Sequence, residues 1–369
     1  MKYCSETVSR KIAVLSAIAT VAVVIIHSNS LENIRDCVFM FWIGRIIGYF
    51  QHWAVPFFFM VSGFFFDRFF CEKPFWTNLP GFLLRKVKSL AIPYVLWGSV
   101  FGFITMTPLR IYVNHQHGDS LLAGTIFASN SAWDVIDKVL GISACNFVEA
   151  LWYVRLLIIV YMTAPIWIGL RKLSKFMLLL IGLTLVLGFS AVASEAADSA
   201  IVTIGGCFIR VGGIGWMLLG MSVSAFKAEE IRLPPFLCLC SVLVWVAVSA
   251  IIIDNRLHLG TWYPWMQEWY RIAPILLILF WWGAYDFVPQ LLPEKLPEWF
   301  EFRFWTYCMH HPVTAWVGGV VYAVFGHGMC GRVAFQLLVA PITIALCLGM
   351  GMLIKRNFIV AFRTLNGGR

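Results

Sequence analysis

Residues 12–27 read IAVLSAIATVAVVIIH, an apolar run that ends in a histidine. The run approaches the ~20 residues that a bilayer-spanning helix needs. An ionisable side chain at the edge of a bilayer is unfavourable unless it is paired or hydrated, so His27 indicates a functional site. Histidine can also transfer protons near neutral pH. The alternative is that His27 only anchors the helix end at the lipid headgroups.

The composition of the remaining chain is that of a membrane protein. Of 369 residues, 60% are hydrophobic and 13% are charged, whereas soluble domains contain about 25% charged residues. We therefore predict an all-α, polytopic membrane protein with about ten transmembrane helices. The predicted helices cover residues 12–28, 46–66, 89–107, 151–170, 176–193, 201–224, 236–253, 269–287, 304–324 and 333–354.

The formal net charge of +9 would suit nucleic-acid binding, but the placement of the charges favours the membrane. With a cytoplasmic N-terminus, 19 of the 28 Lys and Arg residues fall on the inside, 7 fall on the outside and 2 lie within helices. This bias follows the positive-inside rule. It predicts both termini in the cytoplasm and no nucleic-acid partner. The predicted domains are a cytoplasmic N-terminus (1–11), a transmembrane domain (12–354) and a cytoplasmic tail (355–369).

The longest polar stretch, about residues 108–150, is predicted to be an outside loop. His115 and His117 in this loop raise the possibility of a metal site. Their spacing does not suit one helix face, and no third ligand stands nearby in the sequence. We predict a solvated loop and no metal.

Five stretches together resemble the integral-membrane acyltransferase family 3. They occur in the family's order and extend over almost the whole chain. These stretches are Val23–Ser28, Val55–Phe64, Phe82–Lys88 followed by Ile92–Tyr94, Leu151–Leu157, and Tyr307–Pro312. The chain departs from the family at Ser16, where an arginine is usual eleven residues before the histidine, and at Ala13, where an aspartate often stands. Part of the family's first-helix charge is therefore missing.

The resemblance implies transfer of an acyl group, commonly acetyl, from cytoplasmic acyl-CoA to a hydroxyl of an extracytoplasmic or lipid-linked carbohydrate. It also implies a multi-pass protein of the bacterial inner membrane. His27 is the candidate base, acting directly or through an acyl-histidine. Arg85, Lys86 and Lys88 are candidates for binding the CoA phosphates. Topology and anionic lipid explain such a basic loop equally well.

Three more residues complete the candidate site. Arg155 and Arg210 are the arginines placed within predicted helices, where a guanidinium usually faces a wet cavity or an acid. Arg155 is a candidate for donor binding, and Arg210 is the candidate to replace the cation missing at Ser16. His310 matches the histidine that the family has near the C-terminal end of the domain. It is a candidate catalytic residue, or it orients a helix instead.

Two other functions fit the same features. One is a transporter or flippase for a sugar or a lipid-linked sugar, and the other is a non-catalytic relative that lost its chemistry with the arginine at position 16. Neither the acceptor, nor the acyl group, nor the oligomeric state follows from the sequence.

Overall fold

The structure is a computed structural model. It describes residues 5–31, 37–71, 73–101, 103, 107–108, 111, 131–141, 149–188, 201–204, 207–259, 264–287 and 295–368. His115 and His117 lie outside the described residues. The chain forms two compact units, which are described separately. The first unit contains Met1–Leu79, Thr163–Ile201 and Arg210–Phe300, and the second contains Pro80–Met162, Val202–Ile209 and Glu301–Arg369.

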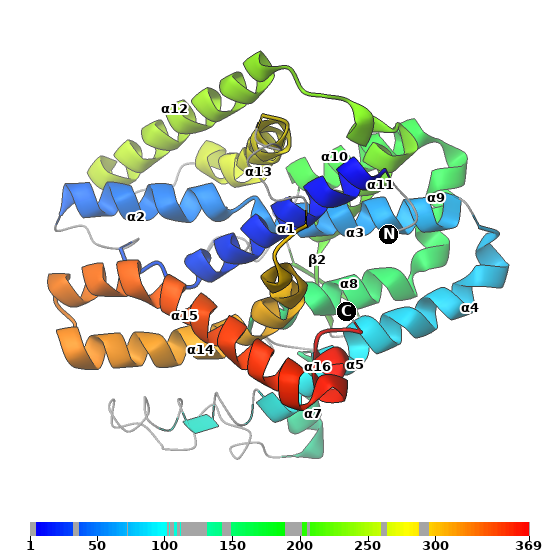
Figure 1. Ribbon diagram of the computed structural model, residues 1–369. Coiled ribbons are helices and arrows are strands. Elements are labelled where there is room, and N and C mark those ends of the chain that lie inside the picture. Colours follow the sequence, from blue (N-terminus) through cyan, green and yellow to red (C-terminus); the bar gives the residue numbers. More distant parts are fainter. Residues whose placement is uncertain are drawn as a thin grey trace. The chain divides into compact units, whose positions relative to one another are not determined.

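The first unit is a bundle built around α3 and α11 (Figure 1). Helix α11 packs against both α3 and α10, whereas α1 packs against α2 and α3 and α12 packs against α13 and α2. The helices are α1 (Glu6–Ile26), α2 (Val38–Gln51), α3 (Ala54–Cys71), α9 (Ala164–Leu173), α10 (Lys175–Gly188), α11 (Val211–Ala225), the 3₁₀ turn η6 (Ala228–Glu230), α12 (Pro235–Leu259) and α13 (Pro264–Tyr285).

The second unit is organised by the hairpin of α14 and α15. Its buried tryptophans bond to backbone carbonyls, since Trp97 Nε1 donates to Leu365 O at 3.1 Å and Trp305 Nε1 donates to Cys347 O at 2.9 Å. Its elements are most of α4 (Phe75–Lys86), the π-helices η1 (Val87–Ala91) and η2 (Trp97–Phe101), α5 (Ile92–Leu96), α7 (Ala132–Leu140), η4 (Glu149–Leu151), α8 (Trp152–Met162), α14 (Arg303–Phe325), α15 (Met329–Asn357), α16 (Ile359–Leu365), and the end of η8 (Glu298–Phe302).

The prediction of an all-α membrane protein is confirmed at the level of fold class. Four helical stretches of the described residues are long and apolar enough to cross a bilayer: Glu6–Ile26, Val38–Cys71, Pro235–Asn255 and Met329–Asn357. The pair α8 and α9 adds a fifth candidate, bent by 63° at Thr163. Pro165 follows this break, and proline cannot donate the backbone bond that would continue a straight helix. The number of ten helices and the location of the termini remain predictions.

Two predicted helices differ in the structure. Residues 201–224 contain a short sheet of β1 (Ile201–Ile204) and β2 (Cys207–Arg210) followed by α11, instead of one helix. The sequence reason is that β-branched residues precede a Gly–Gly pair, a pattern typical of hairpins. Within 89–107, Pro93 interrupts regular α-helical bonding, and π-helical turns stand on both sides of α5.

Glycines allow α3 and α11 to approach closely. A Cβ on Gly63 of α3 would overlap the carbonyl group of Met217 on α11. In the reciprocal position, a Cβ on Gly220 of α11 would overlap the carbonyl group of Met60 on α3. Small residues have this role at helix interfaces in membranes, and here Gly63 and Gly220 let the two backbones come together.

We expect Gly63→Ala to destabilise the protein by about 1–3 kcal/mol, because the methyl group forces the two backbones apart. The control is Gly169→Ala on α9, where an added Cβ meets no atom within 4 Å and alanine favours the helix. Thermal unfolding of both variants in one detergent measures the difference. Equal unfolding temperatures would show that the α3–α11 contact tolerates a methyl group.

Candidate functional site

His27 ends α1 and is exposed. Its backbone N–H donates to Val23 O at 3.4 Å, so the residue closes the last helical turn. The following Ser28 is buried, and its hydroxyl donates to Val24 O at 2.9 Å. The side-chain amide of Asn29 donates to Gly44 O of α2 at 2.8 Å. These bonds hold the turn that carries His27 against α2.

The buried face of α2 places a polar group beside this turn. Arg45, the residue after Gly44, is buried, and its guanidinium carbon lies 5.4 Å from the centre of the Phe41 ring. Tyr49 is one turn further along the same face and is also buried. The sequence analysis missed this face because it began the second helix at residue 46 and counted Arg45 as an outside residue. The available signal was a single arginine inside the apolar run from Val38 to Phe50.

Arg210 does not lie in a helix. It is the last residue of β2, and α11 begins at the next residue. The expectation that Arg210 lies near the middle of a transmembrane helix was therefore wrong, because the first ten residues of the expected helix contain the two strands. Only the backbone of Arg210 is described.

The basic stretch of the second unit is mostly accessible. Arg85 and Lys86 form the last turn of α4, and Lys88 lies in η1. Arg85 and Lys88 are exposed. The Lys86 ammonium lies 4.2 Å from the centre of the Tyr161 ring, a cation–π distance that orients this lysine. Two exposed cations and one oriented cation could contact an anionic ligand.

His310 and Arg155 belong to adjoining parts of the second unit. His310 is fully buried in α14, and its Nδ1 lies 2.6 Å from Tyr307 O, so Nδ1 donates. The Tyr307 hydroxyl donates to Ala150 O, and its ring lies 5.7 Å from that of Tyr153 on α8. Arg155, two residues after Tyr153, is half-buried. The bond to Tyr307 O fixes the imidazole ring, which suits a positioning role.

The candidate residues divide between the two units. His27 and Arg210 belong to the first unit, whereas the basic stretch, Arg155 and His310 belong to the second. Within the described residues, no three His, Cys, Asp or Glu side chains gather where they could hold a metal ion.

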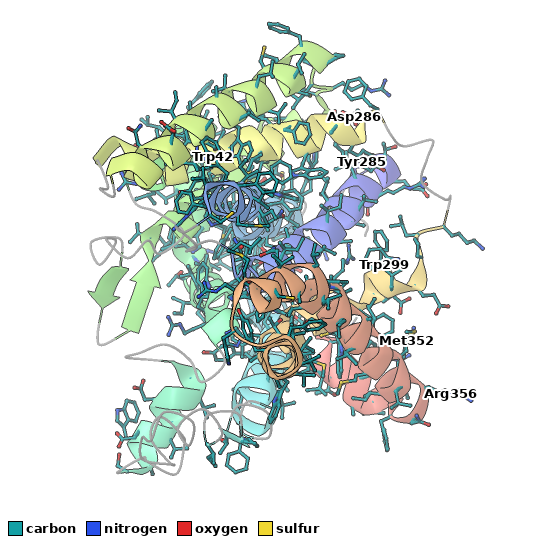
Figure 2. All side chains as sticks on the ribbon, turned by 90° about the vertical axis from the view of Figure 1, so that its left-hand side faces the viewer. Trp42, Tyr285, Asp286, Trp299, Met352 and Arg356 are labelled. Atoms are coloured by element: carbon teal, nitrogen blue, oxygen red, sulfur yellow. The ribbon has the colours of Figure 1, made fainter. Side chains whose placement is uncertain are left out.

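Ion pairs join the helix ends of the first unit that the sequence analysis assigned to the cytoplasmic side. Lys11 Nζ of α1 lies 2.8 Å from Asp286 Oδ1. Figure 2 labels Asp286 just after α13. Consecutive residues at the end of α3 pair with different elements: Asp67 with Arg171 of α9, and Arg68 with Glu229 of η6.

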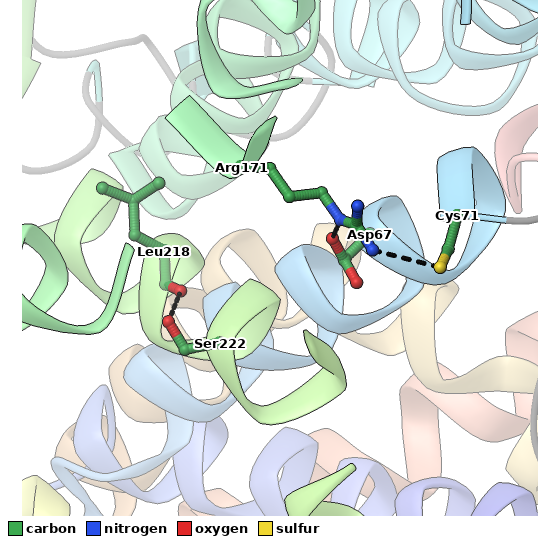
Figure 3. Close-up of polar contacts among 5 residues, drawn as sticks. All are labelled: Asp67, Cys71, Arg171, Leu218 and Ser222. Atoms are coloured by element: carbon green, nitrogen blue, oxygen red, sulfur yellow. Dashed lines mark hydrogen bonds and ion pairs between the residues drawn. The ribbon is translucent and has the colours of Figure 1, made fainter. Parts of the chain in front are cut away.

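Arg171 makes a second contact at this end of the unit. It also donates to Cys71 Sγ at 3.0 Å (Figure 3). The adjacent serine of α11, Ser222, satisfies its own buried hydroxyl by donating to Leu218 O at 2.9 Å. Three acids at this end, Asp67, Glu229 and Asp286, are each paired with a base from another element.

Comparison with known proteins decides the family. A family model described as an acyltransferase domain matches residues 11–353, nearly the whole chain. The chain belongs to acyltransferase family 3. This match covers His27, the α3 glycine and His310 in a single alignment, and it makes the protein a multi-pass membrane acyltransferase. No curated protein and no solved structure gives a significant match.

We expect Glu229→Gln to lower the stability of this acyltransferase by about 3 kcal/mol, because it leaves Arg68 without its counter-charge. The matched control is Glu301→Gln. Glu301 pairs with Lys355 at 2.7 Å, but its side chain is 54% exposed, compared with 2% for Glu229. An exposed pair contributes ~1 kcal/mol or less. The measurement is the thermal unfolding temperature of each variant. Equal decreases in the two variants would contradict a buried ion pair at Glu229.

Proposed function

We propose that the protein is an O-acyltransferase of the bacterial inner membrane. It transfers an acyl group, commonly acetyl, from cytoplasmic acyl-CoA to a hydroxyl of an extracytoplasmic or lipid-linked carbohydrate. The observation that carries this proposal is an exposed histidine at the end of α1, held against a helix with a buried arginine, in a chain that matches the family from residue 11 to 353.

In the proposed reaction, His27 takes the proton of the acceptor hydroxyl. The hydroxyl oxygen attacks the thioester carbonyl, a new C–O bond forms, and the C–S bond to CoA breaks. The proton then passes to the CoA thiolate, which leaves as the thiol. A variant of this route forms an acyl-histidine first. The exposed position of His27 leaves room for the acceptor, which a buried histidine such as His310 lacks.

The donor requires cations for its phosphates. Arg85, Lys86 and Lys88 are the proposed contacts, with Arg155 as an additional one. Two of the three residues of the basic stretch are exposed, as a contact with a ligand from the aqueous phase requires. His310 is proposed as a positioning residue, because its bond to Tyr307 O, within the same helix, orients the imidazole ring.

A cation must also stabilise the negative charge that develops on the carbonyl oxygen. The family's usual arginine is replaced by Ser16. Arg210 is one proposed substitute, and Arg45 is a second. Arg45 is better supported, since Asn29 binds the residue next to it and so brings α2 to the His27 turn.

We expect His27→Ala to lower acyl transfer by about 10²–10⁴-fold while the protein stays folded, because a positioned base contributes this much. The readout is the acetyl content of isolated surface glycans or glycolipids, compared with and without the gene. His327→Ala is the control, since His327 is exposed and its ring stacks on the Tyr322 ring with centres 4.8 Å apart. If the His27→Ala variant were fully active, His27 would not be the base, and it would only anchor the end of α1. Substrate movement that needs no acyl donor would indicate a transporter.

We expect Arg45→Gln to reduce turnover per folded molecule by about 10²-fold or more, and Arg45→Lys to restore part of it. The matched variants at the other candidate are Arg210→Gln and Arg210→Lys. Activity is measured after size exclusion in detergent and divided by the amount of folded protein, so that a lower yield does not lower the measured turnover. A larger loss at Arg210 would assign the cation to the start of α11. Normal turnover of both glutamine variants would show that neither arginine stabilises the transition state, and the missing arginine at position 16 would then have no substitute among these two residues.

A further inference from the structure

The first unit contains an apolar cavity of about 220 Å³ that the proposed reaction does not use. Helices α1, α3, α11 and α13 and the segment after α11 contribute side chains to it. The residues that matter most here are Ile12, Phe64, Val223, Ile278 and Trp282. Almost every lining atom is carbon, so the cavity suits an alkyl chain and disfavours a polar substrate.

The cavity reaches the surface of the unit. Ile231 and Leu279 both line it, and their side chains are 59% and 41% exposed. An apolar cavity that opens between membrane helices is accessible to the hydrocarbon chains of the bilayer. The occupant can therefore enter from the membrane.

One end of the cavity lies beside charged side chains, most of which are paired. Glu229 is the acid in the lining, and Arg68 neutralises it. Lys11 lies 4.3 Å from the centre of the Trp282 ring and is paired with Asp286.

The exposed acid Glu230 ends η6, and the cation Arg232 follows two residues later. Arg232 stands between two lining residues, Ile231 and Leu233, and is exposed. Among the described residues, Arg232 forms no ion pair.

We infer that this cavity binds one acyl chain of an anionic phospholipid, with the lipid phosphate at Arg232. The cavity fits the acyl chain of such a lipid, and the exposed Arg232, which has no ion pair among the described residues and stands between two lining residues, fits its phosphate. Basic sites on the cytoplasmic side of membrane proteins bind anionic headgroups in this way. The inference concerns a bound lipid and does not depend on the proposed acyl transfer.

The test is native mass spectrometry of the purified full-length protein. It is incubated with phosphatidylglycerol or with phosphatidylcholine of the same chain lengths. We expect the wild type to retain phosphatidylglycerol in preference. Arg232→Gln should weaken retention of phosphatidylglycerol about fivefold and leave phosphatidylcholine unchanged. Val223→Trp, which fills the cavity, should weaken retention of both lipids by about tenfold or more.

Two controls make the outcome decisive. Arg363→Gln removes an exposed arginine of the second unit, which does not line the cavity, and should retain phosphatidylglycerol like the wild type. Size exclusion of Val223→Trp confirms its folding, and Arg232→Gln tests the inference independently if that variant fails to fold. Unchanged retention in Arg232→Gln would overturn the inference. Displacement of the lipid by equimolar palmitoyl-CoA would also overturn it, and would assign the cavity to the acyl donor. Activity of the same samples in the glycan assay separates lipid binding from acyl transfer.

Discussion

The close approach of α3 and α11 is the contact on which the first unit depends. Because Gly63 and Gly220 carry no side chain, each glycine accepts the backbone of the opposite helix. In a membrane, lipid tails are as apolar as the side chains, so helix association relies on such packing. The same two helices line the apolar cavity and end at the ion pairs of Arg68 and Glu229. The glycine contact thus sets the distance between the elements that carry both features.

In the first unit, the buried charged side chains at the predicted cytoplasmic end have ion-pair partners. There, Lys11, Asp67, Arg68 and Glu229 are each paired with a residue from another element. Burying a charge without a partner is strongly unfavourable, so these pairs bind helix ends to one another. Arg232 differs because it is exposed and has no ion pair in the described part of the chain. The paired charges hold helix ends together, whereas the exposed guanidinium of Arg232 is accessible to a ligand.

The fold class and the family could be predicted from the sequence. The positions of two arginines and the ion-pair partners could not, for physical reasons. Apolar composition and the five family stretches predicted a helical membrane acyltransferase. Arg45 was missed because hydropathy alone does not define where a helix begins, and the apolar run starts seven residues before it. Arg210 was placed in a helix because periodicity does not distinguish a short apolar strand from a helical turn. The pairing partners of Asp67 and Arg68 lie more than a hundred residues away, so no local pattern reveals them.

The 34-residue helical stretch from Val38 to Cys71, which includes Arg45, Asp67 and Arg68, has a consequence for the dependence of this protein on its bilayer. At 1.5 Å per residue, the stretch is about 51 Å long, whereas a hydrocarbon core is about 30 Å thick. Such a mismatch is relieved by tilt, by the break at His52 and Trp53, or by local thickening of the membrane. Arg45 lies about 10 Å along the stretch from its first residue. The depth of its guanidinium therefore varies with membrane thickness, so thin and thick bilayers hydrate the neighbourhood of His27 differently.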